Sequence, residues 1–216
     1  MGADPNGARW PRLLKELAPT LPGDWDICGG RGAKALLIRQ PVRWTFTWIG
    51  LHRIRVADDP YLMVGLVPTV EPFSLNLTYG QRSDGGGPGT FDLVADDVTA
   101  AIRRYLLDDA LPDLDTWTEP FLAQIAEASL TLSDAERVPA PHFLQAAGWR
   151  VINDTGSPVQ PAEESIAFYR ERDATEEAAW YQSLIDAWHQ GGRATALSYL
   201  EEQRLDGLRR LKILPP

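Results

Sequence analysis

Cysteine and histidine are scarce in this sequence of 216 residues. Cys28 is the one cysteine, so an intramolecular disulfide is excluded. The three histidines, His52, His142 and His189, have no partner at the spacing of metal ligands. The sequence therefore predicts neither a metal site nor a cofactor.

Long apolar runs are also missing. No run approaches the length of about 20 apolar residues that a membrane-spanning helix needs. The N-terminal segment MGADPNGARW lacks the apolar core of a signal peptide. Lysine is rare, with 3 residues against 18 arginines, a bias typical of bacteria whose genomes are rich in G and C. We therefore expect a bacterial, cytoplasmic protein that does not bind membranes.

The common catalytic patterns are absent. The glycine clusters at 29–32 and 85–89 do not open onto a helix, and the first lacks the lysine and hydroxyl of a phosphate-binding loop. No serine lies in a nucleophile-elbow pattern. Cys28 has no base nearby, and Asp26, on the same side of a predicted strand, is expected to raise its pKa. No catalytic residue is assigned, and an enzyme is the less favoured expectation.

Charge is distributed unevenly along the chain, whose formal net charge is −9. Residues 1–94 contain 10 basic and 9 acidic residues, whereas residues 95–216 contain 11 and 21. An acidic surface repels phosphate backbones, so we expect no nucleic-acid partner. A basic protein partner fits the acidic part, and so does a solvated helix surface that binds nothing.

One long strand pattern, Val42–Val56, stands at the centre of the sequence. Its even positions are mainly aromatic or apolar, and its odd positions are rich in arginine and threonine, which predicts a strand with two different faces. Gly50 has no side chain to pack and predicts a bulge or bend. Ile49 and Leu51 interrupt the polar face, so a cover over its middle is also expected.

Shorter patterns lie on both sides of this strand. Further strands are predicted at Trp25–Cys28, Ala33–Arg39, Tyr61–Val70 and Phe73–Tyr79. Helices are predicted at Ala8–Ala18, Ala95–Leu107, Thr118–Leu130 and Pro141–Ala147, with a small strand at 149–152. In the helix at Thr118–Leu130, the side chains at helical spacing are Phe121, Leu122, Ile125 and Ala128.

The C-terminal stretch predicts an antiparallel helical hairpin. Residues 153–161 are turn-rich and form the best candidate for a linker. The helix that follows, 162–190, is either continuous or broken near Asp173, and Gly191 and Gly192 separate it from a helix at 193–212. The side chains predicted to face each other are Trp180, Leu184, Ile185 and Trp188 on one helix and Leu197, Leu200, Leu205 and Leu208 on the other.

Short connections between the strands favour an antiparallel meander. We therefore predict an α+β fold: a mainly antiparallel sheet of four or five strands, with helices on one face and a helical C-terminal part. Residues 1–112 are expected to form the sheet domain and 113–216 a mostly helical part packed on it, unless the two make one continuous domain.

Three arginines of the central strand are the first candidate site. Arg43, Arg53 and Arg55 lie on one predicted face. Arginine offers planar, bidentate contacts to carboxylates. This basic face is therefore expected to bind either the chain's own acidic helices or an acidic partner or anionic ligand.

The aromatic face of the same strand is the second candidate site. Trp44, Trp48, His52 and Tyr79 would line a pocket between the sheet and the helices, with Arg43 or Arg53 at its rim. The alternative is that these residues, His52 included, are packed in the core.

Three features of the chain occur together: the strand RWTFTW at 43–48, the strands at 62–70 and 73–79, and the closing hairpin at 181–211. This combination resembles small bacterial α+β proteins of unknown function, some of which occur among toxin-neutralising immunity proteins. The resemblance implies a non-enzymatic acidic protein that binds and blocks a partner.

Two functions follow from these observations. The leading hypothesis is a non-catalytic, immunity- or adaptor-like module that binds a protein through acidic helix faces and exposed aromatic side chains. The alternative is a small-molecule enzyme or ligand-binding protein that uses the pocket of Trp44, Trp48 and His52. The two differ in whether Trp48 and His52 lie in a filled core or an open cavity.

Overall fold

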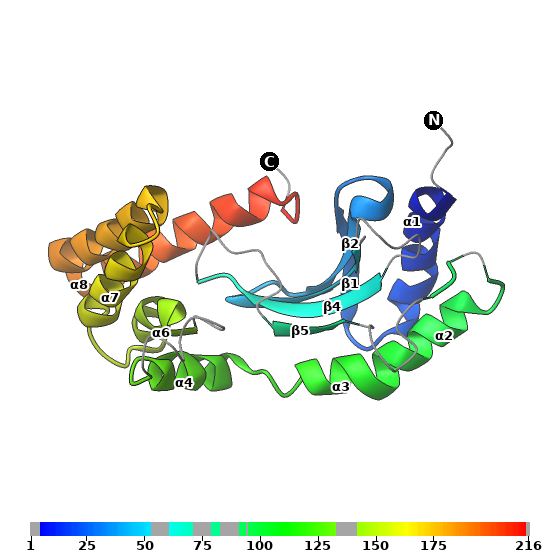
Figure 1. Cartoon of the computed structure of the whole chain (residues 1–216), viewed down its shortest axis with the longest axis horizontal. Helices are drawn as coiled ribbons and strands as arrows, with labels where there is room; N and C mark the ends of the chain where they lie inside the picture. Colours follow the sequence, from blue (N-terminus) through cyan, green and yellow to red (C-terminus); the bar gives the residue numbers. More distant parts are fainter. Residues whose placement is uncertain are drawn as a thin grey trace. The chain divides into compact units, whose positions relative to one another are not determined.

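A meander of five antiparallel strands is the centre of the first part of the chain (Figure 1). The computed structural model describes residues 5–52, 61–70, 79–82, 91–93, 95–132 and 142–214, with the backbone alone at 5–7, 52, 61 and 79–82. Each strand pairs antiparallel with the next, in the order β1 (Asp24–Gly29), β2 (Ala35–Gln40), β3 (Thr45–His52), β4 (Tyr61–Pro68) and β5 (Tyr79–Arg82). The predicted α+β class and antiparallel sheet are confirmed.

The central strand is shorter than its pattern predicts, since β3 begins at Thr45 instead of Val42. Its pairing with β4 runs without interruption from Thr45 opposite Pro68 to His52 opposite Tyr61. The predicted bulge at Gly50 is therefore wrong on this side of the strand. Residues 53–60 and 71–78 lie outside the described part, so the predicted strand at Phe73–Tyr79 is described only where β5 begins, at Tyr79.

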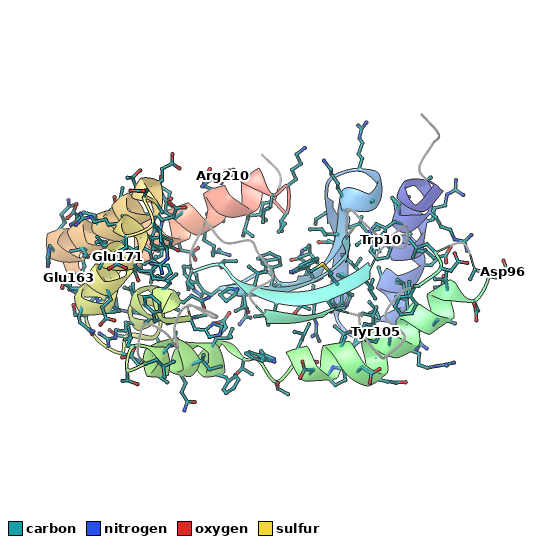
Figure 2. The ribbon with its side chains drawn as sticks, in the orientation of Figure 1. Trp10, Asp96, Tyr105, Glu163, Glu171 and Arg210 are labelled. Atoms are coloured by element: carbon teal, nitrogen blue, oxygen red, sulfur yellow. The ribbon has the colours of Figure 1, made fainter. Side chains whose placement is uncertain are left out.

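The middle of the odd-numbered face of β3 is buried at Thr47 and Ile49, as the expected cover over it predicts, whereas Thr45 and Leu51 are half-buried. Leu37, Ile49 and Val64 are neighbours across β2, β3 and β4, and each is 0% exposed. Helix α1 (Pro5–Leu17) packs on β2, where the Trp10 indole N–H donates to the carbonyl of Ala35 at 2.8 Å (Figure 2). The apolar stripe of this helix and the middle of the sheet thus form one core.

The other face of the sheet is covered by the end of the chain. Ile38, Phe46 and Val67, on β2, β3 and β4, form a buried cluster with Leu208 and Ile213. A backbone hydrogen bond of 3.2 Å from the Gly29 amide to the carbonyl of Lys212 holds this C-terminal segment at β1. Apolar side chains therefore pack against both faces of the sheet.

A second helical segment follows the sheet. It consists of α2 (Val98–Tyr105), a π-helical turn (Leu106–Ala110) and α3 (Leu111–Leu114). The helix predicted to end at Leu107 thus continues, because Pro112 falls in the first turn of α3, where its missing N–H costs nothing. Arg39 of β2 pairs with Asp115 just beyond α3, at 2.5 Å between Nη1 and Oδ1.

The chain divides into two compact units. Unit 1 contains Met1–Thr69, Ser74–Trp117 and Leu208–Pro216, and unit 2 contains Val70–Phe73 and Thr118–Gly207. In the described part of unit 2 the helices are α4 (Glu119–Ser129), the short 3₁₀ turn His142–Gln145, α6 (Ala146–Asn153), α7 (Val159–Arg170) and most of α8 (Thr175–Arg210). No helix in the described residues is both long enough and apolar enough to cross a membrane.

Two local predictions in unit 2 need correction or completion. The small strand predicted at 149–152 is wrong, because these residues belong to α6, which ends at the left-handed Asp154 (φ 55°). Trp149 and Val151 are both buried, so their alternation with half-buried neighbours resembles a strand pattern. The helix predicted from 162 is broken at Asp173 (φ 56°), which separates α7 from α8.

The predicted helical hairpin is the fold of α8, which turns back on itself at Gly191 and Gly192. Gly192 has φ 62° and ψ −150°, a conformation that is almost restricted to glycine. The Tyr199 hydroxyl donates to the carbonyl of Trp180 at 3.1 Å, and the two rings lie 5.8 Å apart. Leu208, predicted to face the first helix, instead packs in the sheet core of unit 1.

Candidate functional site

Of the residues predicted to form a site on the central strand, Trp48 belongs to packed structure. It is half-buried and packs against the cluster of Ile38 and Phe46. A Cβ atom at Gly50 would lie 2.6 Å from Leu36 Cδ2 and 2.8 Å from Trp48 Cζ3. These two side chains therefore occupy the space that Gly50 leaves open, which is the arrangement of a filled core.

The remaining predicted residues are only partly described. Arg43 is exposed and Trp44 half-buried in the segment before β3, where the Arg43 carbonyl accepts from the Thr69 hydroxyl at 3.1 Å. Arg53 and Arg55 lie outside the described residues, and of His52 and Tyr79 only the backbone is described. The grouping of these arginines and aromatic residues into one site stays a prediction.

A groove of about 870 Å³ lies in unit 2, between α4 and α6, and it was not predicted from the sequence. One stripe of α4 lines it, formed by Pro120, Ala123, Gln124, Glu127 and Ala128. Helix α4 begins at Thr118, whose hydroxyl oxygen accepts from the Phe121 amide at 3.4 Å. Its buried positions are Leu122, Ala126 and Ser129. Phe121 and Ala128, placed with the apolar stripe of this helix from the sequence, are exposed.

The α6 side of the groove holds Trp149 and Arg150. Trp149 is 2% exposed, and its buried indole N–H has no acceptor in the described residues. Such an unpaired buried donor is unfavourable, by about 1–3 kcal/mol. The chain after α6, at Asn153, Thr155 and Gly156, completes the lining.

All three guanidinium nitrogen atoms of Arg150 donate hydrogen bonds within the protein. Its Nε donates to Glu127 Oε2 at 3.0 Å and its Nη2 donates to Glu127 Oε1, so α4 and α6 are joined by a bidentate pair. Its Nη1 donates to the carbonyl of Ser157 at 3.1 Å and lies 3.5 Å from Gln160 Oε1. The hydrogen bond with Glu127 raises the pKa of the Arg150 guanidinium. This cation is therefore a part of the wall and not a receptor for an anion.

Exposed apolar side chains flank α4. Phe121 in its first turn is 41% exposed, and Leu132 just after its end is 42% exposed. Helical backbone bonds continue past Ser129 as far as the Leu132 amide, which donates to the Ser129 carbonyl at 3.3 Å. Single exposed apolar side chains are common on protein surfaces, and these two are notable only for their position on or just beyond the helix that lines the groove.

The negative charge of the protein resides in this unit. By sequence, unit 2 contains 16 acidic and 6 basic residues, for a net charge of −10, and unit 1 contains 14 and 15. Exposed carboxylates are frequent on and after α7, where Figure 2 labels Glu163 and Glu171, and at the start of α8. Of the acidic half identified in the sequence, residues 118–207 lie in this unit, whereas 95–117 and 208–216 belong to unit 1.

A second, smaller depression lies between the two halves of the α8 hairpin. Its volume is about 460 Å³, and it is lined by polar groups that include Ser183, Asp186, Tyr199 and Glu202. Burial is the main cause that raises the pKa of Tyr199 to about 12, with a smaller contribution from Glu202 against a hydrogen bond with Ser183. At neutral pH the phenol is therefore a hydrogen-bond donor and not a base.

No described group suggests a reactive centre. Burial, and then the charge of Asp26, raise the pKa of the Cys28 thiol, as predicted for this pair, so the nucleophilic thiolate is disfavoured. Burial lowers the pKa of His142. Within the described residues, no three side chains among His, Cys, Asp and Glu are grouped to hold a metal ion.

The groove could not be predicted from the sequence, because helical periodicity predicts which residues of one helix are buried. It does not predict the space between two helices. A signal was present, since two alanines and a proline share one stripe of α4 with Gln124 and Glu127.

Comparison with known proteins gives no matching family model, no matching curated protein and no matching solved structure.

Proposed function

We propose that this chain is a bacterial, cytoplasmic protein-binding module without catalytic activity, and that its acidic unit 2 binds a basic protein partner. The observation that carries the proposal is the separation of charge, with −10 in unit 2 and +1 in unit 1. A field of one sign steers an oppositely charged protein and disfavours nucleic acid and anionic membranes.

Exposed apolar side chains of unit 2 also support a binding role. Phe121 and Leu132 are apolar side chains more than 40% exposed on the same unit that carries the charge. Electrostatic steering accelerates encounter, whereas buried aromatic and aliphatic anchors supply most of the affinity of a protein interface. Unit 2 has both elements.

The alternative function, an enzyme or small-molecule receptor built around Trp44, Trp48 and His52, has less support. The pocket requires space next to Trp48, and Trp48 packs against Ile38, Phe46 and Leu36. No described observation favours this function over protein binding.

The test compares two variants of equal charge. Glu163, Glu171 and Glu176 of unit 2 are replaced by Gln in one variant, and Asp96, Asp108 and Asp109 of unit 1 are replaced by Asn in the other, all of them exposed. Each tagged protein captures partners from a bacterial lysate at low and at physiological salt. We expect a stoichiometric basic protein that the unit 1 variant retains and the unit 2 variant loses. Equal capture by both variants, or a captured protein that is acidic, would contradict the proposal.

A further inference from the structure

We infer that the groove between α4 and α6 binds a basic amphipathic helix of the protein partner. This inference rests on the proposed function and adds the place and the chemistry of recognition. It is carried by three properties of the groove: its shape, its apolar flanks and its charge.

The shape of the groove suits a third helix. A volume of about 870 Å³ lies open between α4 and the α6 segment. The stripe that lines it runs from Pro120 to Ala128, nearly the whole of α4, and an 11-residue helix is about 16 Å long. Ala123 and Ala128 have short side chains that leave space above this stripe. Apolar side chains of a docked helix, at positions i, i+3, i+4 and i+7, can therefore reach between α4 and α6.

The apolar groups favour an amphipathic partner. Pro120, Ala123 and Ala128 offer apolar surface inside the groove, while Phe121 and Leu132 are exposed near the two ends of α4. A helix with one apolar stripe can cover the groove and bury these side chains, and each square ångström of apolar surface removed from water contributes about 25 cal/mol. Its opposite face remains in solvent.

The charge around the groove favours a basic partner. Helix α4, helix α6, the loop 154–158 and the first half of α7 carry five carboxylates, at Glu119, Glu127, Asp154, Glu163 and Glu164. Two of them pair with arginines, Glu127 with Arg150 and Asp154 with Arg193, so the excess of negative charge comes from the other three. Arg150 is already bonded to Glu127, Ser157 and Gln160.

The same charge argues against other occupants. An anionic ligand would need Arg150 to leave Glu127, which would strand a carboxylate on the groove wall. A second copy of this chain would bring together two units of −10 each. The same negative field that repels an anionic ligand and a second copy of the chain attracts a helix that carries lysine and arginine.

The experiment uses the full chain and designed helical peptides. A fluorescent 14-residue peptide of Leu and Lys with one apolar stripe is compared with a peptide in which every Lys is replaced by Glu. We expect the Lys peptide to bind in a fluorescence anisotropy titration at low salt and the Glu peptide to bind at least about tenfold more weakly. Equal binding of the two peptides would overturn the basic character of the partner, and no binding of either would overturn the inference.

A matched pair of variants locates the binding. Ala128→Arg places a long side chain in the groove, and Ala167→Arg adds the same charge at an exposed position of α7, outside the groove lining. We expect the first to weaken binding of the Lys peptide about tenfold or more and the second to change it less than about twofold. The indole N–H resonance of Trp149, assigned with Trp149→Phe, should shift on titration because this ring lines the groove.

Three other results would place the binding elsewhere or identify a different occupant of the groove. If both arginine variants bind the Lys peptide equally, the groove is not its site, and lysate capture by unit 2 then decides the proposed function independently. If the wild-type chain self-associates in sedimentation experiments and only Ala128→Arg abolishes this, the groove binds a second copy and the inference is overturned. Binding of vesicles that contain anionic lipid would likewise contradict it.

Discussion

Arg193 joins the second half of the α8 hairpin to the end of α6. Its Nε donates to the carbonyl of Val151 at 2.9 Å and its Nη2 donates to the carbonyl of Ile152 at 2.8 Å. The last carbonyls of a helix lack partners within the helix, so these two bonds satisfy groups that would otherwise need water. Because α6 carries Trp149 and Arg150, the turn of the hairpin and the groove wall are mechanically connected.

Replacing Arg193 should therefore destabilise unit 2. Arg193→Ala leaves two carbonyls without donors, and we expect the free energy of unfolding to fall by about 1–3 kcal/mol. Arg193→Lys should recover little, because an ammonium group cannot reproduce two donors in a planar fork. Urea unfolding followed by circular dichroism measures both. Arg170→Ala, on the exposed surface of α7, is the control, and an equal loss in that variant would contradict the role given to Arg193.

The prediction from sequence succeeded where one residue pattern determines one element. The pattern at Ala8–Ala18 predicted helix α1, in which Leu13, Leu14 and Leu17 are buried, and Gly191 with Gly192 predicted the hairpin turn. Both signals are local, since helical spacing and the conformational range of glycine act within a few residues. The meander followed from short connections between strands in the same way.

Prediction failed where distant parts of the chain decide the outcome. Thr47 belongs to the face of β3 predicted to be polar outside its middle, yet it is 8% exposed, because it lies next to the buried Ile49 position. Leu208 has the spacing of a hairpin residue, but the end of the chain packs on the sheet. The candidate groove depends on the separation between α4 and α6, which no single-helix pattern contains.

Gly50 tests whether Trp48 lies in a filled core. In Gly50→Ala the new methyl group would overlap Leu36 and Trp48, so we expect a loss of about 1–3 kcal/mol in the free energy of unfolding and a shift of tryptophan emission. The loss should be smaller by about 1 kcal/mol in a Leu36→Ala background, where one overlapping side chain is gone. Urea unfolding of the double-mutant cycle measures this coupling. A harmless Gly50→Ala would instead favour an open space beside Trp48, as the small-molecule alternative requires.

Two buried tryptophans allow the cost of an unpaired indole N–H to be measured. Trp10 donates to Ala35, whereas Trp149 has no acceptor in the described residues, and both are at most 2% exposed. The same change, Trp→Phe, removes a satisfied donor at position 10 and an unsatisfied one at position 149. We expect Trp10→Phe to lower the free energy of unfolding by about 1 kcal/mol more than Trp149→Phe. Equal losses in urea unfolding would mean that the Trp149 N–H is solvated in solution.

The phenol of Tyr199 should make stability depend on alkaline pH. Its pKa is raised to about 12 by burial first, whereas an unfolded tyrosine titrates near its ordinary value of about 10. A raised folded pKa stabilises the protein fully below the unfolded value, and this contribution is lost as the pH rises from about 10 through about 12. The free energy of unfolding should therefore fall across this window in the wild-type chain and fall less in Tyr199→Phe.

Absorbance titration of the phenolate checks this assignment directly, with circular dichroism to confirm that the chain is still folded. The wild-type protein should show an ionisation near pH 12 that Tyr199→Phe lacks and the control Tyr169→Phe retains. Glu202→Gln should lower this pKa because it removes a negative charge that opposes the phenolate, whereas Ser183→Ala should raise it because it removes a hydrogen bond. An ionisation near pH 12 with the same amplitude in Tyr199→Phe as in the wild-type protein, or a shift of opposite sign in either neighbour variant, would show that the hairpin does not bury Tyr199 as described.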